Sequence, residues 1–170
     1  MDNRIIALNG EVNESSAMKV ILDLLRLDAE DNKTPIYIYI NSPGGNIIHG
    51  LAIYDVIHNI TAPVYTVCNG MAASMGAFLL SCGAKGHRYS LPHSRILIHQ
   101  PLVYSQYGSN LQESEIQSIA ESLGKNRDEL EAIMAANSGK DIETFHKDCE
   151  RDHWLSAQEA LEYGLIDKII

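Results

Sequence analysis

The chain has 170 residues, of which 45% are hydrophobic and 21% charged, an ordinary composition for a folded globular protein. Its 22 acidic and 13 basic residues give a net charge of −9, which argues against a nucleic-acid-binding surface and against an anionic membrane surface. No apolar run reaches the roughly 18 residues of a membrane span, the first residues do not resemble a signal peptide, and the length predicts one domain.

The first predicted elements are a strand, a helix and a second strand. An apolar run at residues 5–8 predicts the first strand, and Asn13 can cap the helix that follows. In this helix, which should reach about Ala29, four apolar residues at helical spacing predict the buried face: Met18, Ile21, Leu22 and Leu25. Residues 36–40 are apolar on both faces, which predicts a central buried strand.

The same plan then repeats along the chain. A glycine turn at residues 43–45 ends the central strand, and a helix follows at about 47–59. Residues 64–68 predict another buried strand, and a turn rich in glycine and alanine leads into a helix that reaches about Ser81. Two short strands are predicted next, at 88–91 and 95–99.

The second half of the chain contains an unusually long helix. A helix over residues 111–136 would be about 39 Å long, because an α-helix rises 1.5 Å per residue. Asn137-Ser138-Gly139 is typical of a helix C-terminus. The later elements are a helix at about 142–150, a short helix that begins with a capping box at 156–159, and a strand at 165–170. Strands that alternate with helices predict an α/β fold with parallel strands.

Three cysteines occur, Cys68, Cys82 and Cys149, and none of them belongs to a CxxC pair. Cys68 and Cys82 lie in apolar segments. An odd number of cysteines without metal-binding or redox spacing indicates free thiols in a reducing compartment. We therefore expect a cytoplasmic protein.

Ser74 is the strongest candidate for a nucleophile. It follows a predicted buried strand and lies among small residues, in the run GMAASMGA at 70–77, so its neighbours cannot hide its hydroxyl. A hydroxyl at a strand-to-helix turn can be presented to a substrate beside the free amides of the helix N-terminus. The alternative is that Ser74 only caps the helix, as serines in such turns often do.

A serine nucleophile needs a base, and His99 is the histidine best placed to supply it. Of the seven histidines, His99 ends a predicted buried strand, and ligand-facing residues of α/β sheets gather at such ends. The alternative is that His99 only satisfies a buried backbone carbonyl. The base also needs an orienting carboxylate, but among 22 acidic residues spacing alone selects none.

Two backbone amides could stabilise an oxyanion. The amide of Met75, directly after Ser74, is one candidate. The turn at Gly44-Gly45 could supply the other, because glycine permits a close approach of the backbone. The alternative is that Pro43-Gly44-Gly45 is only a tight turn.

Five motifs occur in one order and register over nearly the whole chain. They are INSPGG at 40–45, GMAASMGAFLL at 70–80, IHQPL at 98–102, ERD at 150–152, and LSAQEA with EYGLID at 155–167. In sequence and spacing they closely resemble the ClpP family, the proteolytic subunits of the Clp proteases. The resemblance implies a crotonase-like α/β fold with a protruding handle helix. It also implies one peptidase domain over 1–170, with a head at about 1–98 and 138–170 and a handle at about 99–137.

The resemblance assigns roles to residues by matching these motifs. Ser74 matches the nucleophile, His99 the general base and Asp152 the third member of a Ser-His-Asp triad. The oxyanion-hole amides and a residue that contacts the opposite ring are matched by Gly45, Met75 and Arg151. The implied activity is that of a serine endopeptidase that works through an acyl-enzyme and needs neither a metal nor another cofactor.

The resemblance also implies partners. Family members form homo-oligomers of two stacked heptameric rings around a closed chamber, in which unfolded polypeptides are cut to short peptides. A ring-shaped AAA+ ATPase of the ClpX or ClpA/ClpC type feeds the chamber and uses the ATP; this chain has no GxxxxGK[ST] loop. Neither a nucleic acid nor a membrane is implied as a partner.

The sequence departs from the family pattern in two places. It starts at the family's first core strand, without the preceding helix and axial loops that contact the ATPase, so docking of an ATPase stays open. After His99, a longer and glycine-poor segment at 103–111 replaces the family's glycine-rich substrate-binding strand. Its alternation of polar and apolar residues could still add a strand to a peptide. Either departure fits a specialised paralogue in a mixed ring, or a phage or plasmid version.

Two other functions remain as alternatives. The chain could be a catalytically weak or non-proteolytic scaffold or regulatory subunit of a mixed ring, which the departure at the N-terminus favours. It could also be an acyl-CoA enzyme, because the crotonase-like fold hosts such enzymes and a fold alone does not give a function. Both His99 and Asp152 fall at triad positions, which favours the peptidase over the acyl-CoA enzyme.

Overall fold

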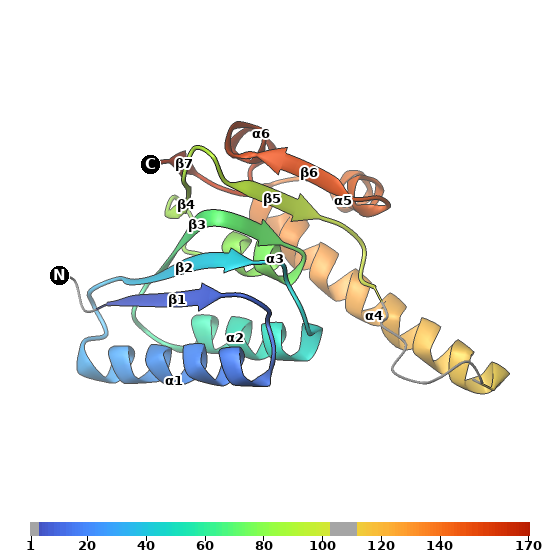
Figure 1. Ribbon diagram of the computed structural model, residues 1–170, viewed down its shortest axis with the longest axis horizontal. Coiled ribbons are helices and arrows are strands. Elements are labelled where there is room, and N and C mark those ends of the chain that lie inside the picture. The colour runs from blue at the N-terminus through green and yellow to red at the C-terminus, as the bar shows by residue number, and fades with distance from the viewer. Residues whose placement is uncertain (1–3, 103–111) are drawn as a thin grey trace.

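The computed structural model describes residues 4–102 and 112–170 of the chain (Figure 1). Within them the elements follow the order β1 (Ile5–Asn9), α1 (Glu14–Glu30), β2 (Ile36–Ser42), α2 (Ile47–Asn59), β3 (Val64–Ala73), α3 (Met75–Ser81), β4 (Arg88–Ser90), β5 (Arg95–Ile98), α4 (Glu113–Ser138), α5 (Ile142–Cys149), β6 (His153–Ser156), α6 (Ala157–Tyr163) and β7 (Lys168–Ile169). All the predicted helices are confirmed, with ends displaced by a few residues.

The strands form one sheet in which most pairs are parallel. The order is β1-β2-β3-β4-β7, and β5 pairs in parallel with the end of β3. Among the strands of the described residues, only β6, which pairs with β5, is antiparallel to its neighbour. The predicted α/β class with mainly parallel strands is therefore confirmed. Strand β6 was not predicted, because four residues between a charged turn and a helix cap carry too weak a pattern, and pairing with β5 stabilises the strand.

The core lies between the sheet and the helices that cover one of its faces. Helices α1 and α2 run side by side under β1, β2 and β3, with α3 next to them (Figure 1). Among the largest side chains with almost no exposed surface are Leu24 of α1, Ile40 of β2 and Phe78 of α3. Burial of these apolar groups provides the main favourable term in folding.

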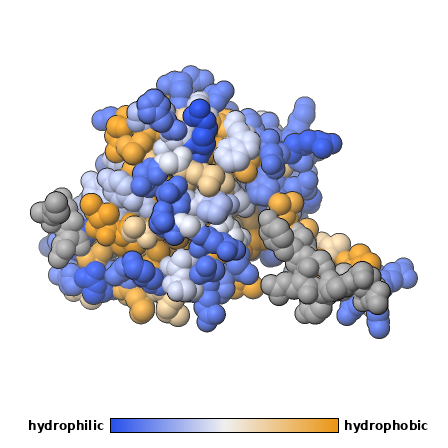
Figure 2. All heavy atoms as spheres, viewed as in Figure 1, coloured by the Kyte–Doolittle hydropathy of each residue, from blue (hydrophilic) through white to orange (hydrophobic). Residues whose placement is uncertain are grey.

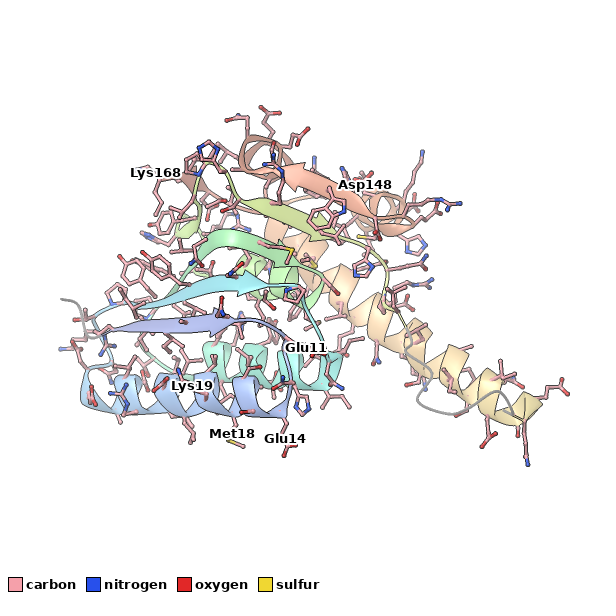
Figure 3. All side chains as sticks on the ribbon, in the orientation of Figure 1. Glu11, Glu14, Met18, Lys19, Asp148 and Lys168 are labelled. Carbon is pink, nitrogen blue, oxygen red and sulfur yellow. The ribbon has the colours of Figure 1, made fainter. Side chains whose placement is uncertain are left out.

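The predicted buried face of α1 is wrong at three of its four residues, whereas the fourth, Ile21, is partly buried against the core. Met18, Leu22 and Leu25 are 53%, 58% and 44% exposed. The buried residues of this helix are instead Ala17, Val20, Leu24 and Leu27. Both sets of residues have helical spacing, so periodicity alone could not decide which of them faces the sheet. In Figure 3, Met18 points away from the sheet, and Figure 2 shows hydrophobic spheres along the lower edge of the molecule, where α1 lies.

The sequence predicts that this strand ends at Cys68, but β3 continues to Ala73. Its pairing with β2 shifts register on the way, because Ile40 pairs with Cys68 whereas Ser42 pairs with Ala72. Gly70 lies within the irregular stretch at φ 121°, a backbone conformation that glycine adopts without a steric penalty. The strand therefore runs directly into the residue that precedes α3.

Helix α4 projects from the rest of the protein (Figure 1). Its buried residues, Leu130, Glu131, Met134 and Ala135, all lie in its C-terminal half. The helix ends at Gly139, whose φ of 72° gives the predicted left-handed C-cap. The division into a head and a handle stays a prediction. In the part of the chain that the structure describes, no helix combines the length and the apolar character that crossing a membrane requires.

A buried ion pair fastens the edge of the sheet to the end of α4. The Arg88 guanidinium donates to both carboxylate oxygens of Asp167, at 2.6 and 2.8 Å, and also to the carbonyl of Asn137 at 2.8 Å. The Arg88 and Asp167 side chains are only 5% and 18% exposed. Burial by itself would raise the pKa of Asp167, but the hydrogen bonds from Arg88 outweigh it and hold this pKa below its usual value.

We expect Arg88→Met to lower the free energy of unfolding by about 3 kcal/mol at pH 7, because it leaves the largely buried Asp167 carboxylate without its guanidinium partner. Calorimetric unfolding measures this loss. Arg26→Met is the matched control, since the ion pairs of Arg26 on α1 are largely exposed and should contribute little. Equal unfolding temperatures for the two variants would contradict this account.

The stabilisation by this ion pair should also depend on pH. The pKa of Asp167 is lowered on folding, so the contribution of Asp167 to the free energy of unfolding is complete above the pKa of the unfolded chain and is lost as the pH falls through the lower folded pKa.

Candidate active site

Ser74 occupies a strained elbow between β3 and α3. Its φ of 55° and ψ of −121° make it the only non-glycine residue with positive φ among the described residues. Such a backbone persists only where the surrounding structure holds it. Here the Ser74 amide donates to the carbonyl of Leu97 at 2.9 Å, and the Ser74 carbonyl accepts from the amide of Phe78 at 3.0 Å. The backbone that carries the Ser74 hydroxyl is therefore held by hydrogen bonds at both its amide and its carbonyl group.

The Ser74 hydroxyl does not cap the helix. Ser74 is the N-cap residue of α3, but its side chain makes no capping hydrogen bond. The N-cap residues of α1 and α5, in contrast, accept hydrogen bonds from amides of the first turn. The alternative that Ser74 only caps the helix is therefore not supported, because the capping hydrogen bond is not formed.

The pairing of β3 with β5 brings Ser74 towards His99. Ala73, the last residue of β3, pairs with Leu97. Ser74 comes directly after Ala73, and His99 comes two residues after Leu97 in a strand that runs in the same direction. Both side chains therefore lie at the carboxyl ends of neighbouring parallel strands, where functional residues of α/β sheets gather.

The pairing of β5 with β6 brings Asp152 to His99. Ile98 pairs with His153 in this antiparallel ladder. His99 follows Ile98 and Asp152 precedes His153, so the two residues face each other just beyond the end of the ladder. The unpredicted strand β6 is thus the element that selects Asp152 from the 22 acidic residues of the chain.

His99 and Asp152 are close, but they are not in hydrogen-bond contact. The His99 Nδ1 and Asp152 Oδ1 atoms are 3.7 Å apart, and the two side chains are 10% and 68% exposed. This separation exceeds a hydrogen bond, and catalytic contacts in ligand-free proteins are often long and tighten in the substrate complex. Within the described residues, the His99 ring makes no hydrogen bond to a backbone carbonyl, so the structural alternative for His99 lacks support.

The glycine turn after β2 packs against the elbow. A Cβ added to Gly44 would lie 2.7 Å from the Ser74 Cβ and 3.1 Å from the Met75 amide nitrogen. Only glycine can approach this closely, and φ values of 96° and 148° for Gly44 and Gly45 also favour glycine. Between them, residues 4–102 and 112–170 offer no protein acceptor to the amides of Gly45 and Met75. Within this part of the chain, the two amides therefore have no protein acceptor that would compete with a ligand oxygen.

No cysteine competes with Ser74 as a nucleophile. Burial raises the pKa of Cys68 to about 11 and the pKa values of Cys82 and Cys149 to about 12. A thiol reacts as its thiolate, which such values keep scarce at neutral pH. All three cysteines are buried and free, as the sequence predicts.

Arg151 and a surface hollow are further features of the described residues. Arg151 is exposed in the turn before β6, on the surface of the single chain. A hollow of about 310 Å³ between α4 and α5 is lined by Asp128, Glu131, Ile142, Glu143 and His146, and none of these belongs to the predicted triad. The segment at 103–111, whose alternating residues could add a strand to a peptide, lies outside the described residues.

Comparison with known proteins gives one consistent result. The family model described as Clp protease matches residues 1–170. The chain is 49% identical over 170 residues to an ATP-dependent Clp protease proteolytic subunit of Streptococcus sanguinis strain SK36. That match covers 100% of this chain and 86% of the streptococcal protein.

Proposed function

The chain belongs to the Clp protease family and is a serine peptidase of the Clp system, and from this premise we propose that Ser74, His99 and Asp152 perform its chemistry. The observation that carries the proposal is the convergence of these three residues at the ends of β3, β5 and β6. Ser74 is the nucleophile, His99 the general base, and Asp152 holds the imidazole in the tautomer that accepts the serine proton.

The reaction then follows the logic of acyl transfer. The Ser74 Oγ attacks the scissile carbonyl while His99 takes its proton, and His99 returns this proton to the leaving amine. The acyl-enzyme on Ser74 is released by a water that His99 activates in the same way. The amides of Gly45 and Met75 donate hydrogen bonds to the developing oxyanion, which is typically the largest electrostatic contribution to catalysis of this kind.

We expect Gly44→Ala to reduce kcat/KM for a peptide substrate about 100-fold, because the new methyl group would press on Ser74 and displace the adjacent amides. The measurement is hydrolysis of a fluorogenic peptide. Gly86→Ala is the matched control: Gly86 has a similar φ of 86°, but a Cβ there would meet nothing within 4 Å. The Gly86→Ala variant should therefore show the effect of backbone strain alone, without a steric clash of the new methyl group. Equal activity of the two variants would remove the glycine turn from the site.

Family membership implies a ring oligomer that works with Clp ATPases. In finer detail, we propose two stacked heptameric rings, with α4 as the handle that joins them and Arg151 contacting the opposite ring. The substrates would be unfolded polypeptides, delivered by an ATPase of the ClpX or ClpA/ClpC type. A mixed ring with a paralogous subunit stays open. The free cysteines are typical of a reducing compartment, which supports a cytoplasmic location.

A direct test compares the peptidase with a non-proteolytic scaffold. The purified protein is incubated with a fluorogenic peptide before and after treatment with a fluorophosphonate, and the mass of the native assembly is measured in parallel. We expect turnover by a ring-sized assembly and its loss on treatment. A ring-sized assembly that neither cleaves the peptide nor reacts with the fluorophosphonate would support the scaffold instead.

A further inference from the structure

Gln100, the residue after His99, connects β5 to the end of α5. Its backbone amide donates to the carbonyl of Cys149 at 2.7 Å. Its side-chain Nε2 donates to the carbonyl of Glu150 at 3.0 Å. Cys149 is the last residue of α5 and Glu150 is its C-cap, so Gln100 satisfies carbonyls that a helix end leaves without partners.

The anchored turn carries Asp152 only two residues further on. The Asp152 side chain is 68% exposed, and its one ion-pair contact among the described residues is with His99. Among residues 4–102 and 112–170, no hydrogen bond holds the carboxylate in place, and its position there depends on the backbone between Glu150 and β6. That backbone is fixed on one side by the β5–β6 ladder and on the other by Gln100.

We propose that Gln100 is a positioning residue that sets the distance between His99 and Asp152. The inference rests on the proposed function, because it assumes that this pair assists Ser74. The hydrogen bonds of Gln100 connect the end of β5, next to His99, to the turn that contains Asp152. The His99–Asp152 pair is already at 3.7 Å, so loosening the turn moves the carboxylate further out of reach. A displacement on the order of 1 Å in a catalytic group can cost up to about 100-fold in rate.

The test replaces the side-chain donor without shortening the side chain. Gln100→Met keeps an unbranched stem but cannot donate to Glu150. We expect a fall of about tenfold in kcat for a fluorogenic peptide with KM within about twofold of wild type, since only alignment and not substrate binding is disturbed. Gln100→Lys, which restores an N–H donor on a long stem, should recover most of the lost kcat.

Gln158→Met is the matched control. Gln158 is an exposed glutamine on α6 whose Nε2 donates to Glu162 at 2.8 Å, and its contacts do not reach the triad. We expect wild-type kcat from this variant. Native mass and unfolding temperature, measured for every variant, separate a change in alignment from a loss of assembly.

A double-mutant cycle separates positioning from a merely structural role. The readout is the rate at which a fluorophosphonate phosphonylates Ser74, with loss of fluoride, which remains measurable where peptide turnover is slow. If Gln100 acts through Asp152, Gln100→Met should change this rate less than about twofold in an Asp152→Asn background. An effect of full size in that background, or wild-type kcat in the single variant, would overturn the inference. A wild-type protein that neither turns over peptide nor reacts would instead overturn the proposed function.

Discussion

Ser74→Ala is expected to abolish peptide hydrolysis while the ring assembly and the unfolding temperature stay unchanged. The substitution removes the group proposed to form the acyl-enzyme, and removal of a triad nucleophile typically costs about 10⁶-fold in kcat. Stability should not fall, because the Ser74 hydroxyl makes no capping hydrogen bond that alanine would lose. The measurement is hydrolysis of a fluorogenic peptide at saturating concentration, together with the native mass.

Ser122→Ala is the control for this experiment. Ser122 is exposed on α4, and alanine is the better helix former, so neither turnover nor stability should fall. Turnover by the Ser74→Ala protein within tenfold of wild type would exclude Ser74 as the nucleophile.

Asp152→Asn should leave the protein folded but slow peptide turnover about 10⁴-fold. The amide is nearly the same size as the carboxylate, so packing is unchanged. It cannot stabilise the imidazolium that forms as His99 takes the proton, and its NH₂ group favours the wrong tautomer of His99. Steady-state kinetics with the same peptide measures the loss.

The matched control for Asp152→Asn is Asp128→Asn. The Asp128 side chain is 71% exposed against 68% for Asp152, and it lies on α4 beside Arg127. Its replacement should leave turnover unchanged. If both variants turned over peptide at the wild-type rate, Asp152 would have no part in the mechanism.

Much of the fold follows from local patterns in the sequence. The Ser156–Glu159 capping box at the start of α6 and the left-handed Gly139 at the end of α4 are both confirmed. Ser74 and His99 could be proposed from local sequence because Ser74 lies in a turn of small residues after a predicted buried strand and His99 ends another. The packing face of α1 could not, because two apolar stripes share the helical period and only the sheet selects between them.

The acid of the triad shows why local sequence is insufficient. Asp152 precedes a short strand that exists because it pairs with β5, a contact between residues more than fifty positions apart. Only the family motif at 150–152 pointed to it. The approach of Gly44 to Ser74 and the contacts of Gln100 with the end of α5 are likewise tertiary features. A glycine pair after one strand and a glutamine after the histidine were the signals that could have drawn attention to them.

The most direct test of the central claim identifies which residue the fluorophosphonate phosphonylates and whether His99 is required. The wild-type assembly and a His99→Ala variant are treated with the probe, digested, and mapped by mass spectrometry. We predict one adduct per chain on Ser74 in the wild type, and a rate of adduct formation at least about 1,000-fold lower in the variant. An adduct on another serine, or equal rates on Ser74 with and without the imidazole, would contradict the account.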